Sequence, residues 1–86
     1  MNKFNKQICD KVLSSFAEAL KIDRSDINIE RKFSEFSNLD SLGFVKLIIS
    51  LNNEFNIELD TEHVLECDNI IQLSNYIESL MYKKNK

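Results

Sequence analysis

The residues that we weigh for covalent chemistry are Ser41 after Asp40, the single histidine His63, and the cysteines Cys9 and Cys67. A serine hydrolase needs a base oriented towards its nucleophile and donors for the oxyanion. Ser41 does not lie in the Gly-x-Ser-x-Gly turn that exposes such a nucleophile. A catalytic Ser41–His63 pair is therefore the weaker hypothesis, and the residues themselves predict that the protein is not an enzyme.

Metal and nucleotide sites are also disfavoured by the residue types. Phosphate-binding loops and dinucleotide folds require several glycines, and the chain has one. No run has the alternating acids and central glycine of an EF-hand calcium loop. Cys9, Cys67 and His63 have no recognised zinc-ligand spacing, so we expect no metal. Both cysteines lie among apolar residues and are predicted to be reduced core side chains.

The charge of the chain excludes another class of function. The formal net charge is -3 and the pI is about 5.1, whereas a nucleic-acid binder needs a basic face. The stretch from Glu54 to Asp68 contains six acids and no lysine or arginine. No apolar run approaches the ~20 residues of a membrane span, and "MNKFNKQICDKV" lacks the apolar core of a signal peptide. We expect a soluble, cytoplasmic protein without nucleic-acid or membrane partners.

The hydrophobic pattern predicts helices. With 86 residues, 43% apolar, the chain is long enough for one small domain, 1–86, with its own core. The absence of proline leaves few helix breakers. Residues 21–39 have no helical period but a regular supply of large apolar groups, so we expect a long loop that packs across the other elements. A helix is predicted over residues 4–20, where apolar residues recur every four positions: Phe4, Ile8, Val12 and Phe16.

A second helix is predicted to begin at Asp40, whose carboxylate caps the first turn and meets the positive end of the helix dipole. This helix is the most apolar in the chain, so we expect it to be central. A short helix follows around Val64, and Asn69 with Gln72 has the spacing of a capping box for a fourth helix. The fold class is therefore all-α: a small four-helix bundle of three main helices and one short helix. The basic end, 83–86, is expected to fray.

Ser41 is better placed to be modified than to catalyse. It lies in the first turn of the predicted second helix, where backbone N–H groups and the helix dipole favour a phosphate ester. A serine that another enzyme modifies needs no base of its own. The alternative is that Asp40 and Ser41 only begin a helix, and spacing by itself favours that alternative.

Longer stretches of the sequence resemble a known family. "LDSLGFVKLIISLNNEFNIEL" is similar to the signature of acyl and peptidyl carrier proteins, in which the serine of Asp-Ser-Leu bears 4'-phosphopantetheine. Phe33 lies eight residues before the serine, where acyl carriers commonly have phenylalanine, and "CDNIIQLSNYIESL" is similar to the fourth-helix end of the family. The resemblance implies a covalent 4'-phosphopantetheine on Ser41, with Asp40 and Leu42 as the flanks of the motif.

The resemblance also implies a mechanism. A phosphopantetheinyl transferase would move the arm from coenzyme A to Ser41, and the terminal thiol would hold an acyl or aminoacyl group as a thioester. A stand-alone, monomeric carrier of this kind catalyses nothing. It receives cargo from a loading enzyme, shelters it transiently between the second and third helices, and presents it to downstream enzymes at high effective concentration.

Departures from the family pattern bear on the pathway. Fatty-acid carriers usually have acids along the second helix, and here that stretch has Gly43, Phe44, Lys46, Asn52 and Asn53. Fewer acids weaken attraction to a basic partner. We therefore favour a specialised pathway, of polyketide or nonribosomal-peptide type, over a housekeeping fatty-acid carrier or a D-alanyl carrier.

The predicted partner surface lies on the second and third helices, at Phe44, Lys46, Ile49, Glu62 and Val64. Helical spacing makes Phe44 equally suited to the core. A hypothesis from another class is a helical interaction module that carries no modification.

Overall fold

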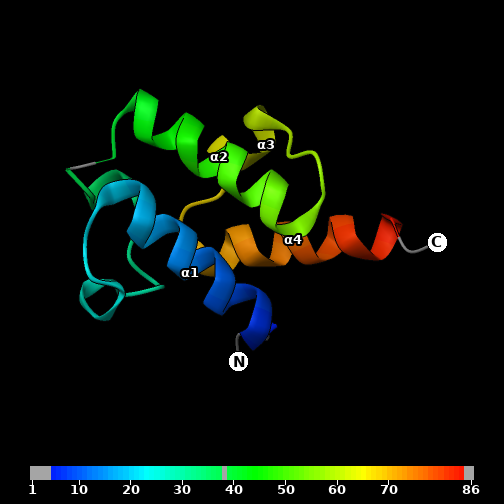
Figure 1. Cartoon of the computed structure of the whole chain (residues 1–86), viewed down its shortest axis with the longest axis horizontal. Coiled ribbons are helices and arrows are strands. Elements are labelled where there is room, and N and C mark those ends of the chain that lie inside the picture. Colours follow the sequence, from blue (N-terminus) through cyan, green and yellow to red (C-terminus); the bar gives the residue numbers. More distant parts are fainter. Residues whose placement is uncertain (1–4, 38, 85–86) are drawn as a thin grey trace.

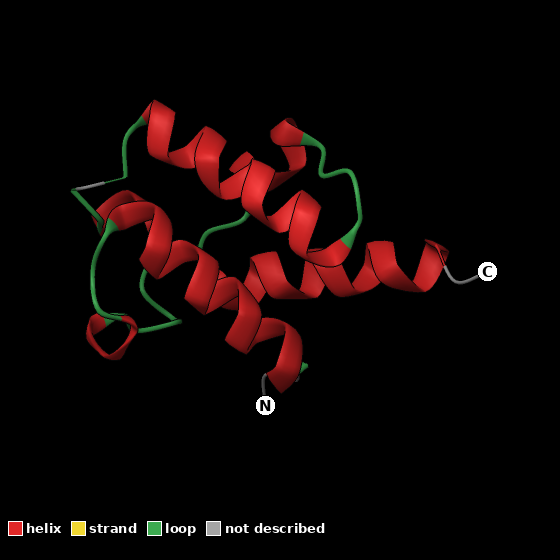
Figure 2. Cartoon of the chain, viewed as in Figure 1, coloured by secondary structure: helices red, strands yellow, loops and turns green. Residues whose placement is uncertain are grey.

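The computed structural model describes residues 5–37 and 39–84, and these ranges contain helices and no strand (Figures 1 and 2). Three helices have 15 residues each and one has six, which confirms the predicted four-helix bundle. Two short 3-10 turns lie between the first two helices. The elements in chain order are α1 (Lys6–Leu20), η1 (Arg24–Asp26), η2 (Phe33–Glu35), α2 (Ser41–Phe55), α3 (Thr61–Glu66) and α4 (Ile70–Lys84).

The core lies where α1 packs against both α2 and α4 (Figure 1). It is built from side chains of these three helices that have 0% exposure: Val12, Phe16, Leu47, Leu51, Ile70, Leu73 and Ile77. The prediction that α2 is the central helix is wrong, because α1 contacts both of the other long helices. One stripe of α2 consequently stays on the surface, and this stripe borders the site described below.

The connection between α1 and α2 packs across the bundle, as predicted. Ile27 and Phe33 are buried. The Phe33 ring lies 5.5 Å from the ring of Phe16, and Phe36 meets the same ring edge-on at 5.0 Å. These aromatic contacts hold η2 against α1, and so fix the loop that leads to the start of α2.

The start of α4 agrees with the capping prediction, with one difference in detail. Asn69 caps α4, since its Oδ1 accepts from the Gln72 N–H at 2.9 Å. The Gln72 side chain accepts from the Asp68 N–H at 2.8 Å, one residue before the group that a capping box uses.

Residues 83 and 84 of the predicted frayed tail continue α4, and residues 85–86 lie outside the described residues, as does Phe4. Among the helices of the described ranges, none combines the length and apolarity that crossing a membrane requires.

Lys21 ends α1 in the left-handed conformation, with φ of 58°. A Cβ is disfavoured there, and glycine is the usual residue at such a position. We expect Lys21→Gly to raise the free energy of unfolding by about 0.5–1 kcal/mol, measured by urea denaturation. Lys21→Ala removes the same side chain but keeps the Cβ, so it should give no such gain. Equal effects of the two variants would contradict this account.

Candidate functional site

Ser41 is the first residue of α2, and Asp40 holds it there. The Asp40 Oδ1 accepts from the Gly43 N–H at 2.7 Å, and the Asp40 carbonyl accepts from the Phe44 N–H at 2.9 Å. These bonds confirm Asp40 as the cap. The Ser41 side chain is exposed, and its hydroxyl has no hydrogen-bond partner within residues 5–37 and 39–84. The helix therefore starts without using the Ser41 hydroxyl, which is left accessible to another enzyme.

Gly43 is needed for close packing rather than for an unusual backbone angle. It is buried and lies in α2, and its φ is not positive. A Cβ at this position would lie 3.1 Å from the Asp40 Oδ1, closer than ordinary contact. The glycine thus leaves room for the carboxylate to reach the first turn of α2, which accounts for the chain's single glycine directly behind the Asp-Ser-Leu motif.

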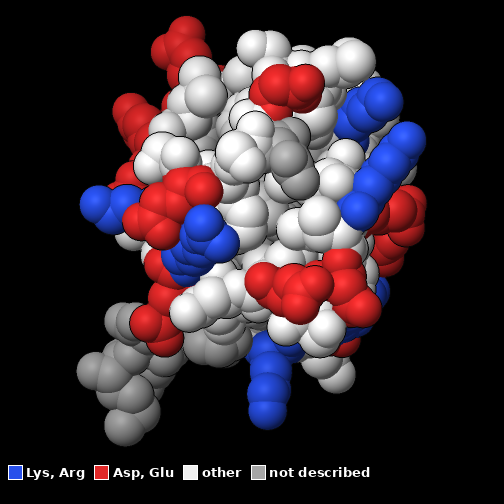
Figure 3. Space-filling view, turned by 90° about the vertical axis from the view of Figure 1, so that its left-hand side faces the viewer, with Lys and Arg blue, Asp and Glu red and all other residues white. Residues whose placement is uncertain are grey.

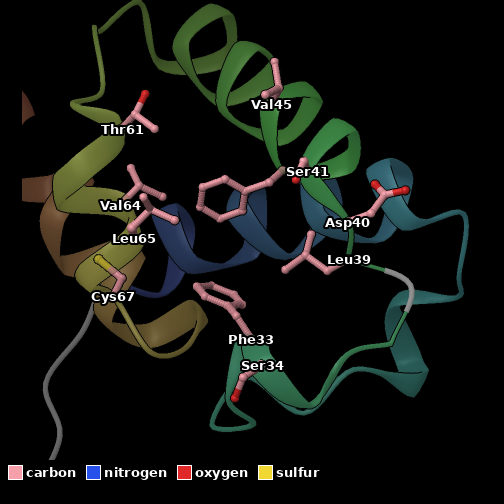
Figure 4. Close-up of a pocket in the computed structure, with 11 residues that line it drawn as sticks. Phe33, Ser34, Leu39, Asp40, Ser41, Val45, Thr61, Val64, Leu65 and Cys67 are labelled. Atoms are coloured by element: carbon pink, nitrogen blue, oxygen red, sulfur yellow. The ribbon is translucent and has the colours of Figure 1, made fainter.

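A cavity of about 420 Å³ opens beside Ser41 (Figure 4). Figure 4 shows Val64 and Leu65 of α3 on one side, facing Leu39 on the other. Most of the wall is apolar; of its polar side chains, Asp40 and Ser41 lie on the α2 side, Thr61 lies on α3 and Ser34 lies on the loop. The cavity is formed by three segments that meet at the start of α2: Phe33, Ser34 and Leu39 from the loop, Asp40, Ser41, Phe44 and Val45 from α2, and Thr61, Val64, Leu65 and Cys67 from α3 and its end.

The residues predicted for a partner surface are placed differently by the structure. Lys46, Ile49 and Glu62 are exposed, as such a surface requires. Phe44 is half-buried, packs against the core and lines the cavity. Val64 has 0% exposure, because the six-residue α3 has to bury one apolar side chain to stay on the bundle. Val64 is therefore corrected from a surface residue to a cavity wall residue.

Four exposed apolar side chains line or border the cavity, and of these the sequence analysis singled out only Ile49 for partner contact. Val45 is 49% exposed on α2 and Leu65 is 66% exposed on α3, next to Leu42 at 63% and Ile49 at 55%. Leu42, Val45 and Ile49 follow a three- and four-residue spacing on α2, so they form one exposed stripe. The same spacing was visible in the sequence, but a second apolar stripe on the helix obscured which one faces outward.

Charge near this stripe is sparse and mixed. Glu54 is the one acid of α2, and its carboxylate pairs with the Lys11 ammonium of α1 at 3.6 Å. Figure 3 shows acidic and basic side chains interspersed on the face that carries the loop before α2. Mixed charges give a weak steering field. The surface beside Ser41 thus consists mainly of the apolar stripe, with Lys46 as a neighbouring positive charge.

His63 does not help Ser41 in this structure. Its ring stacks on Tyr76 of α4, with ring centroids 3.9 Å apart and an angle of 4° between the planes. His63 is also not one of the residues that line the Ser41 cavity. Within the part of the chain that the structure describes, no cluster of three or more His, Cys, Asp or Glu side chains is placed to hold a metal ion.

The two cysteines are free thiols with different surroundings. Cys9 is buried, as predicted, whereas Cys67 is half-buried and lines the cavity. Burial raises the pKa of the Cys9 thiol. Burial also raises the pKa of the Cys67 thiol, and the nearby charges of Asp68 and Glu66 raise it further. Both thiols are therefore protonated at neutral pH and weakly nucleophilic.

Comparison with known proteins decides the family. A family profile described as "Phosphopantetheine attachment site" matches residues 10–77. The chain belongs to the phosphopantetheine-attachment family. Relatives of the same family support this: an acyl carrier protein from Clostridium acetobutylicum is 33% identical over 72 residues, covering 84% of this chain and 94% of the relative. An acyl carrier protein from Cyanidioschyzon merolae is 34% identical over 80 residues, covering 93% of this chain and 86% of the relative.

Membership of the phosphopantetheine-attachment family identifies the cofactor as covalently attached 4'-phosphopantetheine, and the chain as a carrier protein. Family members are served by phosphopantetheinyl transferases and by the enzymes of their pathways. The residues around Ser41 fit this group: α2 begins with a hydroxyl that has no partner in the part of the chain that the structure describes, and an apolar cavity adjoins it. A phosphate ester at the first turn of a 15-residue helix also meets the positive end of the helix dipole.

Proposed function

We propose that Ser41 is the attachment residue and that the chain carries an acyl or aminoacyl thioester on its arm. The observation that carries this proposal is the Ser41 hydroxyl at the start of α2, beside the cavity, which is exposed and has no hydrogen-bond partner among the described residues. When bound, the arm supplies a terminal thiol that forms the thioester. On the chain itself, Asp40 caps α2 and holds Ser41 at the surface, where a transferase reaches it.

The attachment step needs no base from this chain. The Ser41 oxygen forms a bond to the phosphorus that carries pantetheine in coenzyme A. The pyrophosphate P–O bond breaks, and adenosine 3',5'-bisphosphate leaves. The transferase accepts the hydroxyl proton, which explains a serine with no histidine beside it. In this proposal the chain is acted on by enzymes and is not itself an enzyme.

Intact mass spectrometry tests this proposal against the two other classes. After incubation with coenzyme A and a broad-specificity transferase, the protein should gain about 340 Da, one arm. An unmodified interaction module would gain no mass with any of several transferases. A hydrolase using Ser41 would react with a serine-directed phosphonate, and we expect no such label.

We further propose that the partners belong to a specialised pathway and dock on the exposed stripe of α2. The support is that Leu42, Val45 and Ile49 are exposed there, while the one acid of α2 is already paired with Lys11. An apolar partner surface with an acid facing Lys46 fits this stripe better than a basic one does. Glu62 on α3 is available to pair with a positively charged group of the partner at the edge of this interface.

The cavity gives a prediction for the cargo. If an octanoyl group on the arm enters the cavity, it covers Cys67, which lines the wall. Alkylation of Cys67 by iodoacetamide should then slow severalfold, because a thiol reacts only when it is accessible. Peptide mass spectrometry follows the rate, and buried Cys9 is the internal control. An acetyl cargo is too short to fill the cavity and should leave the Cys67 rate unchanged, whereas equal rates with both cargoes would contradict sheltering.

A further inference from the structure

One wall of the cavity rests on the least buried helix of the bundle. Of the residues Thr61–Glu66, all of which the structure describes, Val64 is the buried one. Thr61, Val64 and Leu65 of this helix line the cavity, together with Cys67 at its end. The position of α3 therefore sets the width of the cavity beside Ser41. Burial of the single Val64 side chain contributes only a small part of the free energy that would hold α3 in this position.

The segments on both sides of α3 are fixed independently of the helix. Before it, Leu59 is buried and its N–H donates to the Asn52 Oδ1 at 2.9 Å. After it, the Asp68 carbonyl accepts from the Phe33 N–H at 2.7 Å. Movement of α3 can therefore take place between two anchored ends, without unfolding of the bundle.

Tyr76 of α4 makes two contacts with α3 and its capping residue, where Val64 provides the one buried side chain. Its ring stacks on the His63 ring at 3.9 Å, with the planes 4° apart. Its phenol oxygen accepts from the Asp60 N–H at 3.0 Å. Asp60 is the cap of α3, since its carboxylate accepts from the Glu62 N–H at 3.2 Å. The Tyr76 side chain thus contacts α3 at two points: at its capping residue, Asp60, and in its first turn, at His63.

We propose that Tyr76 is a positioning residue that fixes α3 against α4 and so sets the width of the cavity beside Ser41. The consequence for cargo rests on the proposed function, but the positioning itself concerns the unmodified chain. A hydrogen bond of ordinary net strength changes the opening equilibrium of α3 about fivefold. The stack on His63 has a comparable effect.

The alkylation rate of the Cys67 thiol reports whether α3 is open. Its thiol donates to the His63 carbonyl at 3.6 Å and lines the cavity, so opening of α3 exposes it. The experiment measures iodoacetamide alkylation of Cys67 and Cys9 in the unmodified full-length chain, by peptide mass spectrometry. Tyr76→Phe keeps the ring and removes the bond to Asp60, and His63→Ala removes the stack. We expect each to raise the Cys67 rate about fivefold and to leave the Cys9 rate unchanged.

The matched control is Tyr82→Phe, which removes a hydroxyl from the same helix at a side chain that is 68% exposed. It should leave both rates unchanged. The inference is overturned if Cys67 reacts at the wild-type rate in Tyr76→Phe and His63→Ala. It is equally overturned if the Cys9 rate rises in parallel, since that would mean a general loss of stability.

A second comparison separates this inference from the proposed function. In the octanoyl-loaded protein, Tyr76→Phe should weaken the protection of Cys67 that the cargo gives. If no arm can be loaded on the wild type, the proposed function fails, while the alkylation rates of the unmodified chain still decide the role of Tyr76. If the arm loads and Tyr76→Phe leaves the protection intact, the effect of Tyr76 on cavity width is refuted.

Discussion

Ser41→Ala is expected to abolish attachment of the phosphopantetheine arm and to leave the fold in place. The substitution removes the one atom that would form the phosphate ester. It leaves the cap of α2 intact, because Asp40, and not Ser41, accepts the hydrogen bonds from the Gly43 and Phe44 N–H groups. The change in the free energy of unfolding should stay within about 0.5 kcal/mol, as for other surface substitutions.

Ser34→Ala is the matched control for this variant. Ser34 also lines the cavity and is exposed, so a transferase that attaches the arm to any accessible serine there would use it. We expect Ser34→Ala to gain one arm at the wild-type rate, measured by intact mass after incubation with coenzyme A and a transferase. A mass gain in Ser41→Ala would show that the arm is attached to another residue. A large drop in its unfolding temperature would assign Ser41 a structural role.

Phe16→Ala should have the largest effect on stability. The Phe16 side chain has 0% exposure and its ring contacts both Phe33 and Phe36. Truncation leaves a cavity at the point where α1 meets the loop, and we expect a loss of about 3–5 kcal/mol. Since small domains have about 5–15 kcal/mol of stability in total, this variant should be marginally folded.

Urea denaturation measures this loss, with Tyr82→Ala as the control for removing an aromatic ring from an exposed position. The control should lose less than about 0.5 kcal/mol. A loss below about 1 kcal/mol in Phe16→Ala would show that the core relaxes around the missing ring. Because Phe33 lines the cavity, the variant should also disturb the loop wall next to Ser41.

The helices and the attachment candidate could be predicted from sequence because their signals are local. Apolar residues at a four-residue spacing indicate α1, and Asp40 before an apolar run indicates the start of α2. The structure places the Asp40 carboxylate on the Gly43 N–H, as capping requires. The loop before α2 was recognisable as packed because its large apolar residues had to be buried somewhere.

Which face of α2 turns inward could not be predicted. The helix has two apolar stripes, and its period alone does not say which one meets α1. Leu47 and Leu51 are buried, whereas Val45 and Ile49 are exposed. Val64 was misplaced for a related reason, since six residues are too few to define an inward face.

The contacts of Tyr76 are long-range and had no local signal. Residues 63 and 76 lie on different helices, and their stacking depends on how α3 and α4 approach each other. The cavity likewise appears only when three separate segments meet at Ser41. Local pattern thus identified the attachment residue as a candidate, while tertiary packing determines what surrounds it.

The mass of the peptide that contains Ser41, in protein purified from its own host, tests the central claim most directly. We expect this peptide to be heavier by about 340 Da, or by that arm plus a cargo that hydroxylamine releases. The mass of the cargo would also distinguish a specialised pathway from fatty-acid synthesis. An unmodified Ser41 peptide, or an arm found on another residue such as Ser34, would contradict the account.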